Sequence, residues 1–191
     1  MLHKIKAAFA VLAATLLVTT AQVKPAMAAN TGHQAANFAS HTGNIIYLAA
    51  AVGLPLLRDG AEGHENALRT ADAIGTSVAI AEVLKNIVRE RRPDHTTRDS
   101  FPSGHATAAF AAAGVESALH PKEAPLWYLG ATLISASRVA LHRHYIHDVL
   151  VGAALGYATA KYELSRPHGL ILSPLIGRGD NGMSASFAMQ F

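Results

Sequence analysis

The chain has 191 residues with 16 basic and 13 acidic side chains, a formal net charge of +3, and no cysteine. This length suits one domain with a sizeable core and is short for two. The missing cysteines exclude disulfide bonds and thiolate catalysis. No basic tail or DNA-reading motif accompanies the charge, so we expect no nucleic-acid partner.

Residues 1–28 have the pattern of a secretory signal peptide. Lys4 and Lys6 precede an apolar run, and a small-x-small cleavage pattern ends at Ala28. We expect cleavage after Ala28 and an exported, periplasmic protein; an uncleaved anchor is the weaker interpretation because the run is short. This segment holds three of the 16 basic residues and none of the 13 acids, so the remaining chain has no net charge with histidine neutral.

Small and polar side chains fill residues 29–41, where we expect a flexible mature N-terminus. Residues 42–191 then form a single domain, in which apolar periodicity and turn signals predict an all-α fold, a compact helical bundle of about five to six helices. Gly152 and Gly156 lie four residues apart in the last of them, so another helix can approach closely there. The expected helices cover about residues 42–57, 65–91, 103–119, 124–141 and 147–164.

The pattern changes after Pro167. Apolar stretches flank a turn-rich segment at residues 177–182. In the second stretch apolar and polar residues alternate with a period of two, which predicts a small C-terminal β-hairpin. No apolar run after Ala28 reaches the roughly 18 uninterrupted residues of a spanning helix. We therefore favour a soluble bundle, with peripheral membrane contact as an open alternative because the helices are unusually apolar.

Two short segments carry residues suited to binding an anion. Lys85 and Arg92 are seven residues apart, so both lie on one face if the helix persists that far, although such a pair is usually a solvated helix end. Farther along, Ser103 can cap a helix, and Gly104 lets a ligand approach the free N–H groups at its start. A simple capped helix with His105 as a polar first-turn residue is an equally good interpretation.

The third segment contains Arg138, His144 and Asp148 and is the most informative. If the last helix begins near residue 147, Asp148 lies one turn from His144 and can accept a hydrogen bond from one ring nitrogen. That bond would fix the tautomer and raise the nucleophilicity of the other nitrogen. Arg138 supplies the bidentate guanidinium that a phosphate prefers.

A metal site is the alternative interpretation of this segment. His142, His144, His147 and Asp148 form a dense group of possible ligands. Against it, His142 and His144 do not have helical ligand spacing, and a metal would not explain the cations in the other segments.

Together the three segments resemble the type 2 phosphatidic acid phosphatase superfamily, which also contains the vanadium-dependent haloperoxidases. That pattern is Lys-x6-Arg-Pro, then Pro-Ser-Gly-His, then Ser-Arg-x5-His-x3-Asp. The resemblance extends from about residue 85 to residue 156. The matching residues are Lys85 with Arg92-Pro93, Pro102-Ser103-Gly104-His105, and Ser137-Arg138 with His144 and Asp148.

The resemblance implies a metal-independent phosphatase that hydrolyses phosphomonoesters, with lipid phosphates and diphosphates among the candidate substrates. It implies that His144 attacks phosphorus to give a phosphohistidine, that Asp148 orients His144, and that His105 protonates the leaving group. It implies no metal and no cofactor, and vanadate is expected to bind as a phosphate mimic. The residues that would bind the phosphate oxygens are Lys85, Arg92, Ser103, Gly104 and Arg138.

Two other functions are alternatives to the phosphatase. A vanadate-dependent haloperoxidase would use the same pocket, but this chain is much shorter than those enzymes. A non-enzymatic, histidine-rich metal-binding protein is the second alternative. Within the phosphatase interpretation, the substrate is either a soluble phosphorylated small molecule or a lipid phosphate, and the sequence does not decide between them or fix the oligomeric state.

Overall fold

The computed structural model describes residues 25–166, 169–170, 178–179 and 182–183. The chain divides into two compact units, residues 1–34 and 35–191, and the boundary between them falls within helix α2 (Pro25–Phe38). Most of the predicted signal peptide lies outside the described residues, and its cleavage remains a prediction. The elements below belong to the second unit.

The segment expected to be flexible, residues 29–41, is helical. Helix α2 continues to Phe38, and a π-helical turn, η1 (Ala39–Gly43), leads directly into α3 (Asn44–Arg58). The structure differs from the expectation because small residues here are mainly alanine, the strongest helix former. Ser40 in η1 is also completely buried, so tertiary contacts hold this turn in place.

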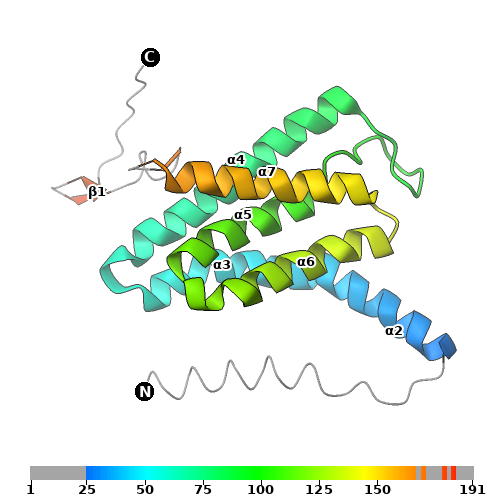
Figure 1. Cartoon of the computed structure of the whole chain (residues 1–191), viewed down its shortest axis with the longest axis horizontal. Helices are drawn as coiled ribbons and strands as arrows, with labels where there is room; N and C mark the ends of the chain where they lie inside the picture. The colour runs from blue at the N-terminus through cyan, green and yellow to red at the C-terminus, as the bar shows by residue number, and fades with distance from the viewer. Residues whose placement is uncertain (1–24, 167–168, 171–177, 180–181, 184–191) are drawn as a thin grey trace. The chain divides into compact units, whose positions relative to one another are not determined.

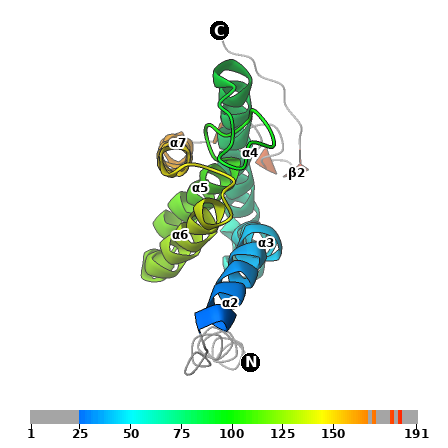
Figure 2. The same ribbon diagram turned by 90° about the vertical axis from the view of Figure 1, so that its right-hand side faces the viewer.

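The structure confirms the predicted all-α fold (Figure 1). A 3-10 turn, η2 (Gly60–Glu62), precedes α4 (Gly63–Val88), and α5 (Gly104–Leu119) follows a long loop. A second 3-10 turn, η3 (Pro121–Glu123), leads to α6 (Ala124–Ala140), and α7 (Ile146–Leu164) completes the bundle. Both views show α5 among its neighbours (Figure 1, Figure 2), and it packs against α3, α4, α6 and α7.

Small side chains allow α5 to take this central place. Its buried residues are mostly alanines, so neighbouring helix backbones come close. On the facing helix α7, a Cβ added to Gly156 would lie 2.1 Å from the Thr107 carbonyl oxygen, and one added to Gly152 would lie 2.6 Å from the Ser103 carbonyl oxygen. The close approach predicted for these two glycines is therefore confirmed.

Helix α4 is shorter than predicted. It ends at Val88, and Arg89 has φ 53°, the left-handed conformation that commonly terminates a helix. Arg92 therefore lies in the loop before α5, where its N–H bonds the Thr97 carbonyl, and it does not share a helix face with Lys85. The one-face prediction for this pair is wrong, since it required the helix to continue past Arg89.

At the C-terminus, strand β1 (Arg178–Gly179) pairs antiparallel with β2 (Gly182–Met183), where the sequence predicts a hairpin turn. Most of the apolar stretches that flank it, residues 171–177 and 184–191, lie outside the described residues.

Within the part of the chain that the structure describes, one helical segment is long and apolar enough to cross a membrane by length and composition. It covers Thr31–Arg58, 28 residues, and only 17% of its apolar window is buried. No such run is evident in the sequence if the first helix begins at residue 42, whereas in the structure the preceding residues continue into that helix.

Candidate active site

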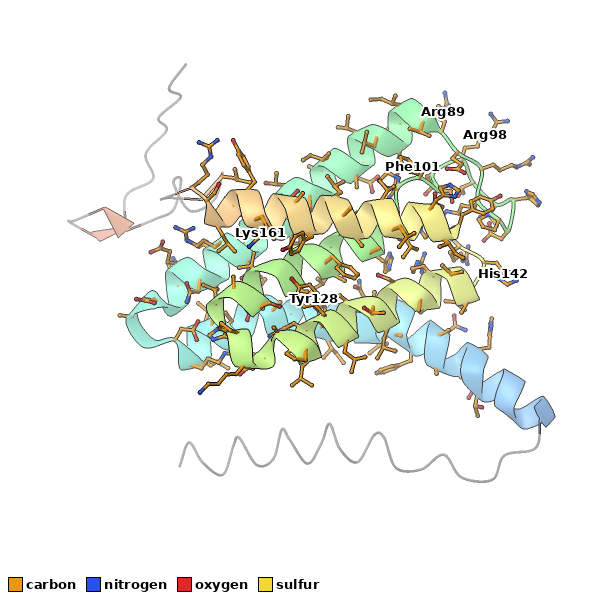
Figure 3. The ribbon with its side chains drawn as sticks, in the orientation of Figure 1. Arg89, Arg98, Phe101, Tyr128, His142 and Lys161 are labelled. Atoms are coloured by element: carbon orange, nitrogen blue, oxygen red, sulfur yellow. The ribbon has the colours of Figure 1, made fainter. Side chains whose placement is uncertain are left out.

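The three predicted segments meet at one end of the helices. Figure 3 shows Arg98 and Phe101, from the loop before α5, at the same end as His142, from the loop after α6. The hydrogen bonds that join these segments include the Ser103 N–H to the carbonyl of Asp148, in the first turn of α7, at 3.0 Å, and Arg143 to the Asp94 carboxylate at 3.0 Å. A cavity of about 510 Å³ opens here, and His144 is among the residues that line it.

His144 is buried, and its partner differs from the predicted one. Its Nδ1 lies 2.7 Å from the Ser100 carbonyl oxygen and 3.6 Å from Asp148 Oδ2. A contact of 3.6 Å is too long for a hydrogen bond, whereas a carbonyl oxygen can only accept. Nδ1 therefore carries the proton, and Nε2 keeps its lone pair. The predicted direct bond to Asp148 is replaced by a bond to the backbone of Ser100.

Asp148 supports His144 through Ser100. Its carboxylate is fully buried, and Oδ2 accepts hydrogen bonds from the Ser100 hydroxyl at 2.5 Å and from the Tyr145 N–H at 2.8 Å. The second bond caps the start of α7. Asp148 thus holds Ser100, whose carbonyl orients His144, and places a negative charge near the His144 ring. Sequence reasoning missed Ser100 because it acts through its backbone and belongs to no motif.

Electrostatics keep His144 neutral. Burial lowers the pKa of its imidazole, and the positive charges of Arg138 and Arg92 lower it further. A neutral ring with the proton on Nδ1 presents a lone pair on Nε2, which is the form a histidine nucleophile requires.

His105 lies in the first turn of α5, near Arg138 and His144. Burial and the charge of Arg138 lower its pKa to about 4, while a hydrogen bond to the backbone of Ser40 acts in the opposite direction. The two histidines of the predicted site are therefore brought together.

The predicted phosphate-binding residues surround this pair. Lys85 Nζ would lie 3.2 Å from a Cβ on Gly104, so the ammonium group covers the glycine at the start of α5. Burial, followed by the charge of Arg92, lowers the pKa of Arg138 to about 10. Ser103 is fully buried and caps α5 by accepting from the Ala106 N–H at 3.5 Å, as predicted.

Both arginines retain a buried N–H donor without a partner. Arg92 bonds Asp99 at 2.7 Å, and Arg138 bonds the Ser40 hydroxyl. The Nε atoms of Arg92 and Arg138 are nevertheless buried and have no hydrogen-bond partner among the described residues. A buried donor without an acceptor is costly, and an anion between these groups would supply one.

Ser40 is the second site residue that sequence reasoning missed. It comes from η1, far from the three motifs, and touches both Arg138 and His105. π-helical turns are often found at functional sites. No signal in the sequence distinguishes this serine from the other small residues of its segment.

An all-α bundle that gathers two histidines, an aspartate and three cations at one end of its helices has the residue set of a phosphate-handling protein. The model of the PAP2 superfamily matches residues 66–168, which include all three motifs, and the chain belongs to this superfamily.

Two curated relatives are phosphatases. Over 118 residues the chain is 31% identical to a lipid A 1-phosphatase of Porphyromonas gingivalis, which covers 59% of this chain and 25% of that relative. Over 90 residues it is 40% identical to a decaprenylphosphoryl-5-phosphoribose phosphatase of Mycobacterium tuberculosis, covering 41% of this chain and 48% of that one. The chain thus spans between a quarter and a half of the length of these relatives.

Two solved structures share the fold. LpxE of Aquifex aeolicus superposes with a TM-score of 0.58 at 24% identity, covering 75% of this chain and 88% of that chain. A transmembrane PAP2-type phosphatidylglycerolphosphate phosphatase from Bacillus subtilis gives a TM-score of 0.53 at 22% identity, covering 83% and 84%.

Proposed function

We propose that the protein is a metal-independent phosphatase that removes a phosphate group from a lipid phosphate or diphosphate through a phosphohistidine. The observation that carries this proposal is the pair of buried guanidinium N–H groups that have no partner among the described residues, near a histidine whose Nε2 keeps its lone pair. Phosphoryl transfer demands mainly positioning and charge stabilisation, and three cations supply both.

The first step is in-line attack of His144 Nε2 on phosphorus. The P–N bond forms as the P–O bond to the alcohol breaks, and protonated His105 gives its proton to the departing oxygen. Lys85, Arg92 and Arg138 neutralise the equatorial oxygens. The Ser100 carbonyl accepts from His144 Nδ1–H throughout this step. The imidazole therefore keeps its orientation, and the positive charge that develops on it lies close to the Asp148 carboxylate.

The second step is hydrolysis of the phosphohistidine. Neutral His105 takes a proton from a water molecule, whose oxygen attacks phosphorus while the P–N bond breaks. Inorganic phosphate leaves, and both histidines return to their starting states.

Exposed apolar side chains favour a lipid substrate and membrane association. At the site end, α4 exposes Ile87 by 71%, and α7 exposes Ile146 by 65% and Leu150 by 64%. Large exposed apolar surfaces on a protein commonly mark contact with another apolar phase. The curated relatives named above also act on lipid-linked phosphates.

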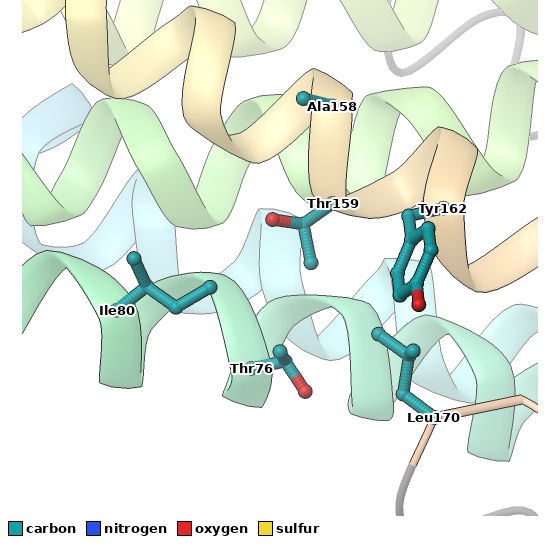
Figure 4. A pocket seen from close by; sticks show the side chains of 6 residues that line it. All are labelled: Thr76, Ile80, Ala158, Thr159, Tyr162 and Leu170. Carbon is teal, nitrogen blue, oxygen red and sulfur yellow. The ribbon is translucent and has the colours of Figure 1, made fainter.

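An apolar cavity of about 460 Å³ between α4 and α7 offers a place for an acyl chain (Figure 4). Along α7 it lies about 11 residues from Asp148, or about 16 Å at 1.5 Å per residue. Its lining residues are Thr76, Ile80, Ala158, Thr159, Tyr162 and Leu170.

The test measures inorganic phosphate released by the purified protein in EDTA, from a short-chain lipid phosphate and from a soluble aryl phosphate. We expect turnover in EDTA, preference for the lipid, and loss of at least a thousand-fold in His144→Ala, since the nucleophile is removed. The matched control is His64→Ala, an exposed histidine in the first turn of α4, which should retain full activity. Activity that persists in His144→Ala, or that vanishes in EDTA, contradicts the proposal.

A further inference from the structure

A second group of ligand-type side chains surrounds the other carboxylate oxygen of Asp148. His147 Nε2 lies 3.0 Å and 3.2 Å from the two Glu90 oxygens and 3.1 Å from Asp148 Oδ1. Among the described residues, these are the only three histidine, aspartate or glutamate side chains whose ligand atoms converge in this way. The alternative ligand set considered from the sequence, His142, His144, His147 and Asp148, is not the one that converges here.

Asp148 Oδ1 is the unusual member of this group. Asp148 is fully buried, and Oδ2 already has two donors, yet Oδ1 has no hydrogen-bond partner among the described residues. The single Nε2–H of His147 is directed at Glu90, so it does not satisfy Oδ1 as well. A buried carboxylate oxygen without a donor or a cation is costly, and this one points toward His147 and Glu90.

The spacing of the three ligand atoms suits a metal ion. Zinc binds histidine nitrogen and carboxylate oxygen at about 2.0–2.2 Å, which places neighbouring ligand atoms of a tetrahedral site about 3.3–3.6 Å apart. The distances from His147 Nε2 to the carboxylate oxygens, 3.0–3.2 Å, are slightly shorter, and all the ligand atoms lie within 4.8 Å of one another, so a small outward shift of the exposed His147 ring reaches this spacing. A nitrogen ligand with two carboxylates favours zinc over magnesium or calcium, which prefer oxygen alone.

The ligands are also held in place and open to solvent. The His147 ring stacks on Tyr145 with centroids 5.4 Å apart, and the Glu90 carbonyl accepts from the Ser100 N–H at 3.0 Å. The His147 side chain is 55% exposed and that of Glu90 29%. An ion can therefore reach the buried oxygen of Asp148 from one side, and water can complete its coordination.

We propose that Glu90, His147 and Asp148 form a binding site for a divalent cation of the zinc type, whose occupancy inhibits the enzyme. The ion would draw the negative charge of Asp148 away from His144 and weaken the hold of Oδ2 on Ser100. The inhibitory part rests on the proposed phosphatase function, whereas ion binding does not.

Calorimetric titration of Zn²⁺ into the untagged full chain tests binding directly. We expect one ion per chain, an affinity at least ten-fold weaker in His147→Gln and in Glu90→Gln, and a zinc-dependent rise in Tm that both variants lose. The matched control is His142→Asn, a neighbouring exposed histidine with φ 55°, a conformation that asparagine tolerates. Its zinc affinity should equal that of the parent chain.

Three results overturn the binding site: no saturable uptake of Zn²⁺, unchanged affinity in both glutamine variants, or an equal loss of affinity in His142→Asn. Phosphate release measured with increasing Zn²⁺ then tests inhibition. We expect Glu90→Gln to keep its basal rate and to require at least ten-fold more zinc for half-inhibition. Zinc that binds at this site without slowing the enzyme overturns the inhibitory role alone. A parent chain with no turnover on any substrate refutes the phosphatase instead.

Discussion

Ser40 holds two groups of the site at once. Its hydroxyl accepts from the Arg138 guanidinium, and its backbone makes a hydrogen bond with His105. Ser40 is completely buried, so no water replaces either contact. A residue that precedes the family match thus positions one phosphate-binding cation and the general acid of the proposed mechanism.

Ser40→Ala removes the hydroxyl and leaves the carbonyl. Arg138 then loses a charge-assisted hydrogen bond, which is typically about 1.5–3 kcal/mol, so we expect kcat/KM to fall by roughly ten- to hundred-fold. The pH dependence should not change, because the carbonyl that bonds His105 remains. Ser40→Thr, which restores the hydroxyl, should recover most of the activity. A lower KM in Ser40→Ala would instead mean that the hydroxyl competes with phosphate for Arg138.

The lowered pKa values of both histidines predict a specific dependence on pH. His144 must be neutral, so its lowered pKa keeps it active well below pH 6 and activity is lost only on further acidification. His105 must be protonated, and its pKa of about 4 in the free protein makes kcat/KM fall as pH rises above that value.

A bound phosphate adds negative charge beside His105 and raises its pKa in the complex. The alkaline fall of kcat should therefore lie at higher pH than that of kcat/KM. Steady-state rates between pH 3.5 and 9 check this. The same alkaline limb for kcat and kcat/KM, or rates that do not fall toward alkaline pH, would contradict the assignment of His105.

At the level of single residues, the motifs identified which side chains meet, but not every contact between them. The structure brings His144, His105 and Arg138 together, whereas Arg92 reaches the site from a loop and not from the helix face that its spacing from Lys85 predicted. The partner of His144 Nδ1 could not be predicted, because a backbone carbonyl such as that of Ser100 leaves no trace in the sequence. The contact between His105 and Ser40 could not be predicted for the same reason, because it also involves the backbone.

The packing of α7 on α5 is the feature of the helices on which the site most depends. Asp148 lies at the start of α7 and His105 at the start of α5, so the separation of these helices sets the geometry between them. At Gly156 an added Cβ would meet backbone atoms, the Thr107 carbonyl at 2.1 Å and the Ala111 nitrogen at 2.8 Å. Backbone cannot give way as a flexible side chain can.

Gly156→Ala should therefore force the two helices apart. We expect a loss of about 1–3 kcal/mol in the free energy of unfolding, typical of overpacking, together with reduced phosphatase activity. The matched control is Gly75→Ala in α4, where nothing lies within 4 Å of the added Cβ. That change should stabilise the protein by up to about 1 kcal/mol, because alanine is the better helix former. Equal effects of the two substitutions in urea unfolding would contradict this account.

Helix positions in the second half of the chain follow from periodicity, but two helix ends do not. Helix α4 stops at Val88 although helix-forming charged residues follow, since Arg89 adopts the left-handed conformation and the loop after it is held by its own hydrogen bonds. The helix before α3 was missed for the opposite reason: residues with no apolar stripe are held by burial of Ser40 against Arg138. Both ends depend on tertiary contacts.

The relation of the whole molecule to a membrane was predicted least well. Apolar runs counted one by one favoured a soluble bundle, because no single run is long enough. The structure shows instead that many large apolar side chains on different helices face outward, and this property depends on which face each helix buries. The large apolar residues with an exposed fraction of at least one half include Ile45, Ile46, Leu56, Leu57, Val83, Ile87, Leu126, Leu129, Leu133, Ile146 and Leu150.

We expect the purified protein to bind phospholipid vesicles. The chain after residue 28 has no net charge with histidine neutral, so binding should depend on apolar burial and change little with salt.

The double substitution Ile87→Ser and Leu150→Ser tests which side chains bind the lipid. It removes exposed apolar side chains from α4 and α7 beside the site loops, and the structure gives neither residue a contact with His105 or His144. It should weaken cosedimentation with phosphatidylcholine vesicles by at least ten-fold and lower turnover of a lipid phosphate. Turnover of a soluble aryl phosphate should stay the same, because the site itself is intact. If the parent protein remains in the supernatant at low and high salt, or if the double variant loses activity on both substrates equally, these side chains do not form a lipid-facing surface.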